Sequence, residues 1–499
     1  MAVIDQDTSN EITLESIQNF EGKYPKQLWY LFLAEMWERF SFYGMRGMLT
    51  VFMVEQLLMK KDEANLKYGA IQAFVYTMAF VGGLFADKIL GFRKSIFWGG
   101  LLMIAGSFTL AFSPDTLFYI GISFTIVGTG FFKPNISTMV GTLYKDGDPR
   151  RDAGFSLFYS GINIGALLGG LLCIWVADNY SWNLAFALAG IFMVFGLGVF
   201  AFTQRTLGPI GLSPLRNKVA PDKSRIYEIL VYAGSLCMIP LILLLVSNSG
   251  YTDMFMYIVG PCTLLYIIFE MTKCTAAEVK KLMAALIFIF FSVVFWAFFE
   301  QSGGSLSLFA RYNLEGTMVG LSPSQVNNFA NALFVIAFSP LVGLIWLSLA
   351  KRKVEPNSVV KFGMGFLFLG ISFYVLYLSG NYADARGITS LNIFVLAYLI
   401  MTFGELCLSP IGLSLMTKLS PKRLFGVMMG MWFLASAYGQ YAAGILGANM
   451  AKVDEKAPNL VKLHGYTSGY EQLAYYGLIC GAVLIIISPL VRMLMQEVK

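Results

Sequence analysis

The sequence of 499 residues is poor in charge and nearly free of histidine. Asp, Glu, Lys and Arg make up 13% of it, whereas soluble domains carry roughly 25%. Long polar stretches are also scarce, and apolar runs such as 282–299 (LMAALIFIFFSVVFWAFF) are long enough to cross a bilayer core of about 30 Å. These features exclude a soluble enzyme, a disulfide-rich secreted domain and a nucleic-acid-binding protein. We therefore expect an all-α polytopic membrane protein that contacts lipid.

Ligands for metals and redox centres are scarce as well. The single histidine, His464, falls in an expected loop between the last two apolar spans, which excludes a histidine proton relay inside the membrane. The six cysteines lie in or beside apolar spans, and none forms a CxxC pair. No nucleophile–base pair is evident either. We expect no metal, no cofactor and no enzymatic activity.

The basic residues are distributed unevenly between the two sides of the membrane. The apolar spans number fourteen, and an even number places both termini on one side. Of the 36 lysines and arginines, 25 fall on the side of the termini and eight on the other. The positive-inside rule then predicts a multi-pass protein of the inner (plasma) membrane with both termini in the cytoplasm.

The spans divide into two related groups with an extra pair between them. The basic loop GGLFADKILGFRK at 82–94 has a counterpart in GLIWLSLAKRK at 343–353. Two related bundles are typical of a transporter that rocks about a central site. The expected order is a cytoplasmic segment (1–27), an N-terminal six-helix bundle (28–203), a cytoplasmic linker (204–225), an inserted, peripheral helix pair (226–272) and a C-terminal six-helix bundle (273–495).

Charges within the first span lie on one helical face. An ionisable side chain near the bilayer centre costs at least about 2.5–3.5 kcal/mol on insertion scales, so each one needs a reason. Glu35, Glu38 and Arg39 have i, i+3, i+4 spacing, which places two carboxylates and a guanidinium together. Tyr43 and Arg46 extend the same face by two turns. This face is the strongest candidate for a functional site.

Three further charges lie in spans that correspond to the first. Lys133 is in the fourth span, Glu300 ends the seventh span of the twelve-helix core, and Glu405 is in the tenth. Pro134, next to Lys133, is predicted to kink or break its helix. Charges that only fixed helix packing would not be expected to keep to equivalent helices. We therefore expect these four helices to line one polar cavity.

The charges of this cavity suit a zwitterionic ligand. Arg39 and Lys133 can hold a carboxylate, and Glu405 can hold an ammonium group. Asn331 is a plausible partner for an amine, and four further side chains are candidates to line the cavity: Tyr76, Asn163, Trp296 and Trp432.

The acidic residues also suggest coupling to protons. Burial raises the proton affinity of a carboxylate, and a nearby cation lowers it. Glu35, Glu38 and Glu300 can therefore change their protonation state during transport. A ligand carboxylate that competes for Arg39 or Lys133 would release a glutamate to take up a proton. Protons are therefore the expected coupling ion.

Four segments resemble signatures of one family. EMWERFSFY at 35–43 resembles the ExxERFxYY motif of the proton-dependent oligopeptide transporters, which have the major facilitator fold. Segments in the fourth, seventh and tenth core spans are also similar to family signatures: FFKPNISTMVGTLY (131–144), FFEQSGGSLSLFA (298–310) and GELCLSPIGLSL (404–415). The inserted pair looks like that of bacterial members, so the resemblance implies 14 transmembrane helices.

The resemblance also implies an activity and a set of roles. The activity is proton-driven symport of di- and tripeptides into the cytoplasm, by a protein that works as a monomer. Arg46 would pair with Glu300 in an external gate. The implied proton-coupling residues are Glu35, Glu38, Arg39 and Glu300. The implied peptide-binding residues are Arg39 and Lys133 at the carboxylate, Glu405 and Asn331 at the amino end, and Tyr43, Tyr76, Asn163, Trp296 and Trp432 around the rest.

One residue departs from the family pattern. Phe42 replaces the first tyrosine of the motif and removes a hydroxyl, which leaves the substrate preference open. A transporter of the same fold for nitrate or a drug is an alternative, but nitrate carriers tend to lose the ExxER charges. A sensor that binds peptide without moving it is the other alternative, and the sequence does not separate it from a transporter.

Overall fold

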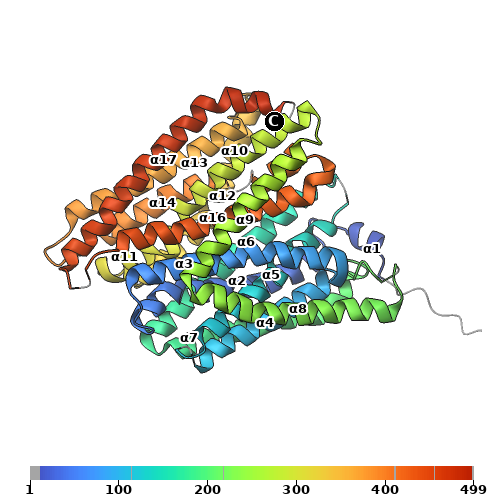
Figure 1. Ribbon diagram of the computed structural model, residues 1–499, viewed down its shortest axis with the longest axis horizontal. Helices are drawn as coiled ribbons and strands as arrows, with labels where there is room; N and C mark the ends of the chain where they lie inside the picture. The colour runs from blue at the N-terminus through green and yellow to red at the C-terminus, as the bar shows by residue number, and fades with distance from the viewer. Residues whose placement is uncertain are drawn as a thin grey trace, which may run out of the picture.

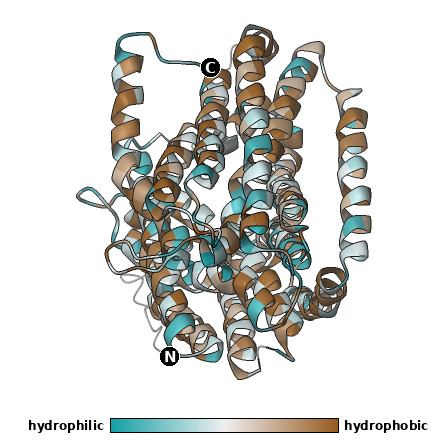
Figure 2. Ribbon diagram, turned by 90° about the vertical axis from the view of Figure 1, so that its left-hand side faces the viewer, coloured by the Kyte–Doolittle hydropathy of each residue, from teal (hydrophilic) through white to brown (hydrophobic). Residues whose placement is uncertain are grey.

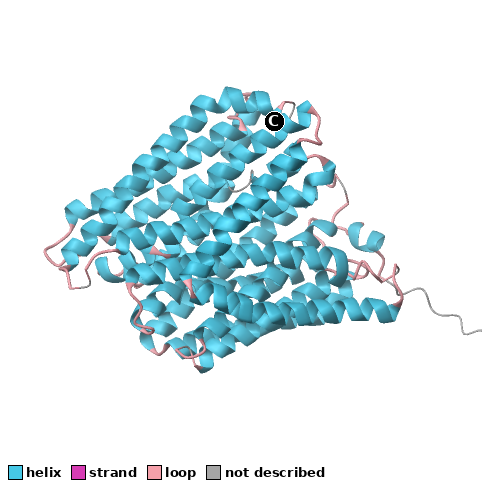
Figure 3. Cartoon of the chain, in the orientation of Figure 1, coloured by secondary structure: helices cyan, strands magenta, loops and turns pink. Residues whose placement is uncertain are grey.

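The computed structural model describes residues 12–113, 115–145, 147–216, 218–408, 412–454 and 456–496. Residues 1–11 of the expected N-terminal segment lie outside the described part. Helices build the described chain, and its only β-structure consists of two isolated bridges (Figure 3). The predicted all-α class is confirmed.

The first half of the chain forms seven helices, followed by the inserted pair. The first-half helices are α1 (Leu14–Gln18), α2 (Lys26–Glu55), α3 (Lys61–Phe85) with a π-helical extension (Ala86–Leu90), α4 (Phe92–Phe112), α5 (Phe118–Thr142), α6 (Arg150–Asn179) and α7 (Trp182–Thr203), which ends in a 3-10 turn (Gln204–Leu207). The inserted pair is α8 (Pro221–Ser247) and α9 (Ser249–Met271).

The second half contains helices that are interrupted. These helices are α10 (Ala276–Phe299), a 3-10 turn (Glu300–Gly303), α11 (Ser305–Asn313), α12 (Pro323–Lys351), α13 (Ser358–Ser379) with a 3-10 turn (Gly380–Tyr382), α14 (Leu391–Leu408), α15 (Gly412–Leu419), a 3-10 turn (Lys422–Leu424), α16 (Phe425–Ala451) and α17 (Asn459–Met495). Within the described residues, eleven helical segments are long and apolar enough to cross a membrane. Three more helices are long enough to cross but are too polar to be counted: α2, α5 and α16, with 30, 25 and 27 residues. The count of fourteen transmembrane helices therefore stays a prediction.

One local expectation is decided in part, and another is wrong. The helix α5 continues through Pro134 to Thr142, so the proline does not break it. The carbonyl that this proline leaves without an N–H partner is that of Gly130, which packs against Gly82 of α3. His464 lies in the first turns of α17 and not in a loop, although its side chain is exposed.

The helices form two bundles that meet along two helix pairs. In the first half α2 packs on α6 and α7, and α4 packs on α5; in the second half α13 packs on α14 and α17. The halves join where α3 meets α16 and where α6 meets α12. A Cβ on Gly69 of α3 would lie 2.7 Å from the Cα of Gly444 on α16, so only small residues allow this approach.

The two halves are inclined to one another. In Figure 1 they lie closest at the left and spread apart at the right, where α1 and the C-terminus lie. We call the end with α1 and the C-terminus the terminal face and the other end the opposite face. Figure 2 shows hydrophobic residues along most turns of the helices, as lipid contact requires.

The inserted pair is attached to both halves. Trp98 and Lys94 of α4 bond α8 through Ser235 (2.9 Å) and Glu228 (2.6 Å). On the second half, α9 is bonded by two tyrosines of α16: the hydroxyl of Tyr441 lies 2.5 Å from Asp253, and Tyr438 donates to the carbonyl of Met256. Arg423 pairs with Glu270 of α9 at 2.7 Å. Figure 1 accordingly shows α8 along the first half and α9 diverging toward α10 and α16.

The basic loop between α3 and α4 is covered by the linker that follows α7. Arg93 donates from Nε to the carbonyl of Ile210 (2.6 Å) and from Nη2 to that of Gly208 (2.5 Å). Gly91 has a φ of 76°, and a Cβ there would lie 2.5 Å from Leu212. Glycine is therefore required both by the backbone conformation and by the approach of the linker.

Candidate transport site

The charged face of α2 forms a buried ionic cluster. The Nε atom of Arg39 lies 3.0 Å from Oε1 of Glu35, and the guanidinium also forms an ion pair with Glu38. The three side chains are at most 2% exposed. The ring of Phe42 covers the guanidinium, with its centroid 5.3 Å from Cζ. One cation thus serves two carboxylates, which leaves a negative charge in excess when both are ionised.

Lys133 on α5 lies beside this cluster but contacts an aromatic ring. Its Nζ atom is 4.3 Å from the ring centroid of Tyr76 on α3, a cation–π distance. It interacts electrostatically with Glu35, Glu38 and Tyr43. Lys133 is half-buried, whereas Arg39 is fully buried. Lys133 is therefore the more accessible of the two cations expected to hold a carboxylate.

Arg46 reaches across to the second half. It forms an ion pair with Glu300, and its Nε atom donates to the hydroxyl of Tyr68 at 2.6 Å. Glu300 sits in the 3-10 turn that interrupts α10 and α11, and Thr50 of α2 donates to the carbonyl of Gly303 there (2.6 Å). A Cβ on Gly303 would collide with the Tyr68 hydroxyl. The helix interruption therefore brings the second half against α2 and α3.

A second set of contacts between the halves lies nearer the opposite face. Arg311 of α11 binds both carboxylate oxygens of Glu55 (2.7 and 2.9 Å) and contacts Asp178 at the end of α6 (2.8 Å). Sequence reasoning assigned no role to these residues. The available signal was the position of Arg311, one of the few basic residues on the side that the positive-inside rule leaves poor in positive charge.

Glu405 belongs to a hydrogen-bonded group within the second half. Asn331 of α12 donates from Nδ2 to Oε2 of Glu405 (2.8 Å) and to the hydroxyl of Thr402 (3.2 Å). One turn earlier on α12, Asn327 accepts from the hydroxyl of Tyr398 on α14 (2.6 Å). These bonds hold α12 to α14 and orient the Glu405 carboxylate.

The remaining predicted residues take simpler positions. Asn163 is buried in α6 and donates to the backbone carbonyl of Tyr159 (3.0 Å). Trp296 is half-buried where α10 meets Gly439 of α16, and the indole of Trp432 packs on the backbone of Gly412. Among the described residues, no hydrogen bond or cation–π contact joins either tryptophan to the charged groups.

The two ends of the expected zwitterion site lie on helices of different halves. Among the described residues, no hydrogen bond or ion pair joins Glu405 to Arg39 or to Lys133. The ion pairs of the described chain that link the two halves involve Arg46 or Arg311 and lie toward the opposite face. The halves are thus fastened on the opposite face and spread on the terminal face (Figure 1).

Comparison with known proteins identifies relatives along the whole chain. The family model of the POT family matches residues 93–463. The peptide transporter YePEPT of Yersinia enterocolitica is 34% identical over 95% of this chain and 96% of its own, and dipeptide and tripeptide permease A of Klebsiella pneumoniae is 29% identical over 98% and 97%. A crystal structure of a peptide transporter POT in complex with sulfate superposes with a TM-score of 0.82 at 32% identity, covering 97% of this chain and 100% of that one.

These matches settle the fold and the class of protein. The major facilitator architecture of the POT structures is that of this chain, and members of the family are membrane transporters and not enzymes. The resemblance to the proton-dependent oligopeptide transporter family is therefore confirmed. The chain belongs to the POT family of transporters.

Proposed function

We propose that this transporter is a proton-coupled symporter that imports di- and tripeptides by alternating access. The observation that supports it best is the placement of Lys133 and Arg39 in one half and of Glu405 with Asn331 in the other. A peptide presents a carboxylate at one end and an ammonium at the other. It can therefore bridge the two halves and stabilise an arrangement in which both enclose it. The names of the relatives, which are peptide transporters and permeases, agree with this substrate class.

The buried cluster on α2 supplies the proposed coupling to protons. Glu35 and Glu38 share the single guanidinium of Arg39, so any weakening of that interaction favours protonation of a carboxylate. A peptide carboxylate bound at Lys133 and competing for Arg39 provides this weakening. One proton moving down a potential of 100 mV supplies about 2.3 kcal/mol, which is enough to concentrate a neutral peptide about fiftyfold.

Glu300 is proposed to link protonation to opening of the opposite face. Its carboxylate is the partner of Arg46, and a protonated Glu300 would lose the charge that holds the guanidinium. The halves would then part at this face while they close at the terminal face. Tyr76, Tyr43 and Asn163 are proposed to contact the peptide backbone, and Trp296 and Trp432 to shape its side-chain pockets. Protons are the coupling ion, and no cofactor is required.

The proposed orientation places the terminal face in the cytoplasm. The excess of lysine and arginine on the side of the termini supports this choice, and the protein is then a multi-pass protein of the inner membrane. On this proposed orientation the described arrangement is an inward-facing one, with Arg46 and Arg311 closing the outer side. Each chain has its own complete set of site residues, so we propose that the monomer is the working unit.

Uptake of dialanine into proteoliposomes tests the proposal. An imposed inward proton gradient should concentrate the peptide, and a protonophore should abolish this accumulation. The absence of gradient-dependent accumulation would contradict symport. Binding of dialanine with no uptake under any gradient would support the sensor alternative instead.

Substitution of Glu38 separates coupling from substrate movement. Glu38→Gln removes a proton-accepting group and should abolish proton-driven accumulation, yet exchange of labelled for unlabelled dialanine should remain measurable. The control is Glu471→Gln on α17, which should leave both activities intact. In the described part of the chain this carboxylate accepts a hydrogen bond from the Tyr475 hydroxyl of the same helix and forms no ion pair. Normal accumulation by Glu38→Gln would show that the coupling role is assigned wrongly.

A further inference from the structure

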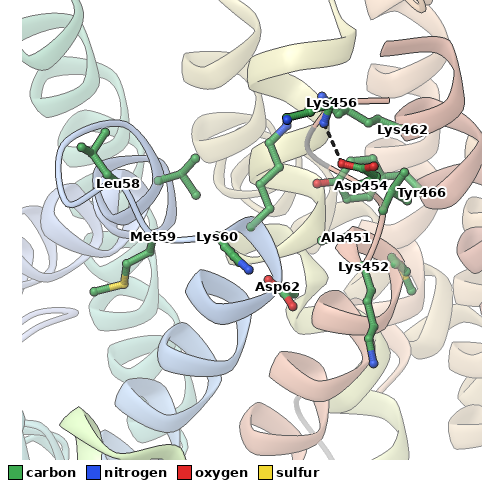
Figure 4. Close-up of a pocket in the computed structure, with 14 residues that line it drawn as sticks. Leu58, Met59, Lys60, Asp62, Ala451, Lys452, Asp454, Lys456, Lys462 and Tyr466 are labelled. Atoms are coloured by element: carbon green, nitrogen blue, oxygen red, sulfur yellow. Dashed lines mark hydrogen bonds between the residues drawn. The ribbon is translucent and has the colours of Figure 1, made fainter. Parts of the chain in front are cut away.

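A cavity rich in lysine lies between the loops of the opposite face. It has a volume of about 740 Å³ and is lined from both halves, by the connection between α2 and α3 and by that between α16 and α17. Five of its lining residues are lysines: Lys60, Lys61, Lys452, Lys456 and Lys462. Figure 4 shows Lys60 with Asp62 on one wall and Lys456, Lys462 and Asp454 on the other.

This concentration of positive charge runs against the general distribution in the chain. The side opposite the termini holds eight of the 36 lysines and arginines, and five of these eight line the one cavity. Aspartates contribute only two negative charges to its described lining, and Asp454 accepts from the backbone N–H of Lys456 (3.0 Å). Lys60 on one wall and Lys456 on the other carry like charges that repel one another, so an anion between them lowers the electrostatic cost of closing this face.

The cavity is continuous with the contacts that close the opposite face. Its lining begins at Val54, next to Glu55, which binds Arg311. Lys61 lies over the ring of Tyr312 from the second half, with Nζ 3.7 Å from the centroid. The two walls move apart when the halves separate here, so the complete cavity exists only while the face is closed.

We propose that this cavity binds a multivalent oxyanion, a free or headgroup phosphate, and that the bound anion holds the opposite face closed. Lysine ammonium groups bind phosphate as point charges and need no fixed bidentate geometry. Lys60 on one wall and Lys456 on the other supply exposed ammonium groups from different halves. An anion between them is a ligand of the closed state alone.

Such a ligand shifts the conformational equilibrium by its differential affinity. At ten times its dissociation constant, an anion that binds only the closed state multiplies the ratio of closed to open protein about elevenfold. Influx requires the face to open, so an external multivalent anion should inhibit uptake. This second effect rests on the proposed function, whereas binding itself does not.

The test uses pyrophosphate on the full-length protein. In detergent, pyrophosphate should raise the melting temperature above that in sodium chloride of equal ionic strength, and isothermal titration should give one site. In right-side-out proteoliposomes, external pyrophosphate at ten times its dissociation constant should reduce the maximal rate of dialanine uptake about tenfold. A thermal shift without inhibition of uptake would support the anion site but contradict either the gating effect or the proposed transport. Uptake of dialanine without pyrophosphate distinguishes these two cases, because it is absent if the transport proposal is wrong.

Two variants and a control locate the effect. Lys60→Gln and Lys456→Gln should each weaken pyrophosphate binding at least fivefold and leave uptake without pyrophosphate unchanged. The control is Arg386→Gln, which removes a basic residue of the same face from outside the cavity. Arg386 is 67% exposed and pairs with Glu315 and Asp384, so this variant should bind pyrophosphate as the parent does. Equal weakening in all three variants, or no binding by the parent, would overturn the proposal.

Vesicles with and without phosphatidylglycerol separate the two sources of phosphate, because only a headgroup ligand makes the pyrophosphate effect depend on the lipid.

Discussion

Arg46 and Glu300, 254 positions apart in the sequence, form an ion pair between the two halves of the transporter. The Arg46 side chain is 14% exposed and that of Glu300 4%, so the pair is largely shielded from water. Tyr68 accepts a further hydrogen bond from the same guanidinium, which fixes its direction. Removal of either charge leaves the other buried without its partner, which costs about 3–5 kcal/mol in proteins.

Glu300→Gln should therefore impair closure of the opposite face and lower dialanine uptake at least tenfold. Arg46→Gln should have a similar effect, and the double variant should recover part of the loss because no unpaired charge remains. A double-mutant cycle on uptake rates and on melting temperature measures the coupling, for which we expect about 1–3 kcal/mol. Strictly additive effects would show that the pair does not work as a unit.

Asn331→Leu should reduce affinity for peptide, because the Glu405 carboxylate loses the amide that orients it. We expect the KM for dialanine uptake to rise about tenfold, with a smaller change in the maximal rate. Thr402→Val is the matched control, since it removes the weaker bond from Asn331 (3.2 Å) together with a bond to the Tyr398 carbonyl on the same helix (2.8 Å), and keeps the bond between Asn331 and Glu405. An equal change in KM for both variants would indicate a general disturbance of α12 and α14.

Gly69→Val should prevent closure of the opposite face, because the added side chain would collide with Gly444 across the contact of α3 and α16. A cysteine introduced at Asn328, which bonds the carbonyl of Gly47, should then react with an impermeant maleimide from outside. Gly343→Val, at a helical position with open space around it, should leave uptake and labelling unchanged. Full uptake by Gly69→Val would refute this role of the crossing.

Removal of the two tyrosine hydroxyls on α16 should loosen the inserted pair. Tyr438→Phe with Tyr441→Phe deletes the bonds to Met256 and Asp253, each worth about 1 kcal/mol. Thermal unfolding in detergent should show a lower melting temperature, whereas Tyr374→Phe, at a 40% exposed tyrosine of α13, should not. An unchanged melting temperature would mean that these bonds do not hold α9 in place.

The sequence predicts the helices well because the bilayer restricts the choices. A chain in lipid must satisfy its backbone hydrogen bonds within each span, so long apolar runs become helices, and Glu35, Glu38 and Arg39 share a face by spacing alone. Pro134 shows where such reasoning leaves alternatives open, since the sequence allowed a kink or a break and the helix is not broken. Its effect depends on how neighbouring helices satisfy the freed carbonyl, and here Gly82 of α3 packs against that region.

Contacts between segments far apart in the sequence could not be predicted from local spacing rules. The pairing of Arg311 with Glu55 and Asp178 joins residues 256 and 133 positions apart, and no spacing rule relates them. The position of Lys133 over the Tyr76 ring likewise depends on how α5 packs on α3. The resemblance anticipated the meeting of Arg46 with Glu300, but the hydroxyl of Tyr68 and the carbonyl of Gly303 emerge only in three dimensions.

The separation of the two helices of the inserted pair reports the angle between the two halves of the transporter. The helix α8 is fastened to the first half, and α9, which also packs on α3 near Asn248, is bonded to the second half through Tyr441 and Arg423. On the proposed rocking motion, the separation of the two helices away from Asn248 therefore follows the state of the transporter. Leu236 on α8 and Leu264 on α9 are 44% and 45% exposed. Spin labels at these two lipid-facing positions would report opening and closing from outside the peptide path, with every charged residue of the site left in place.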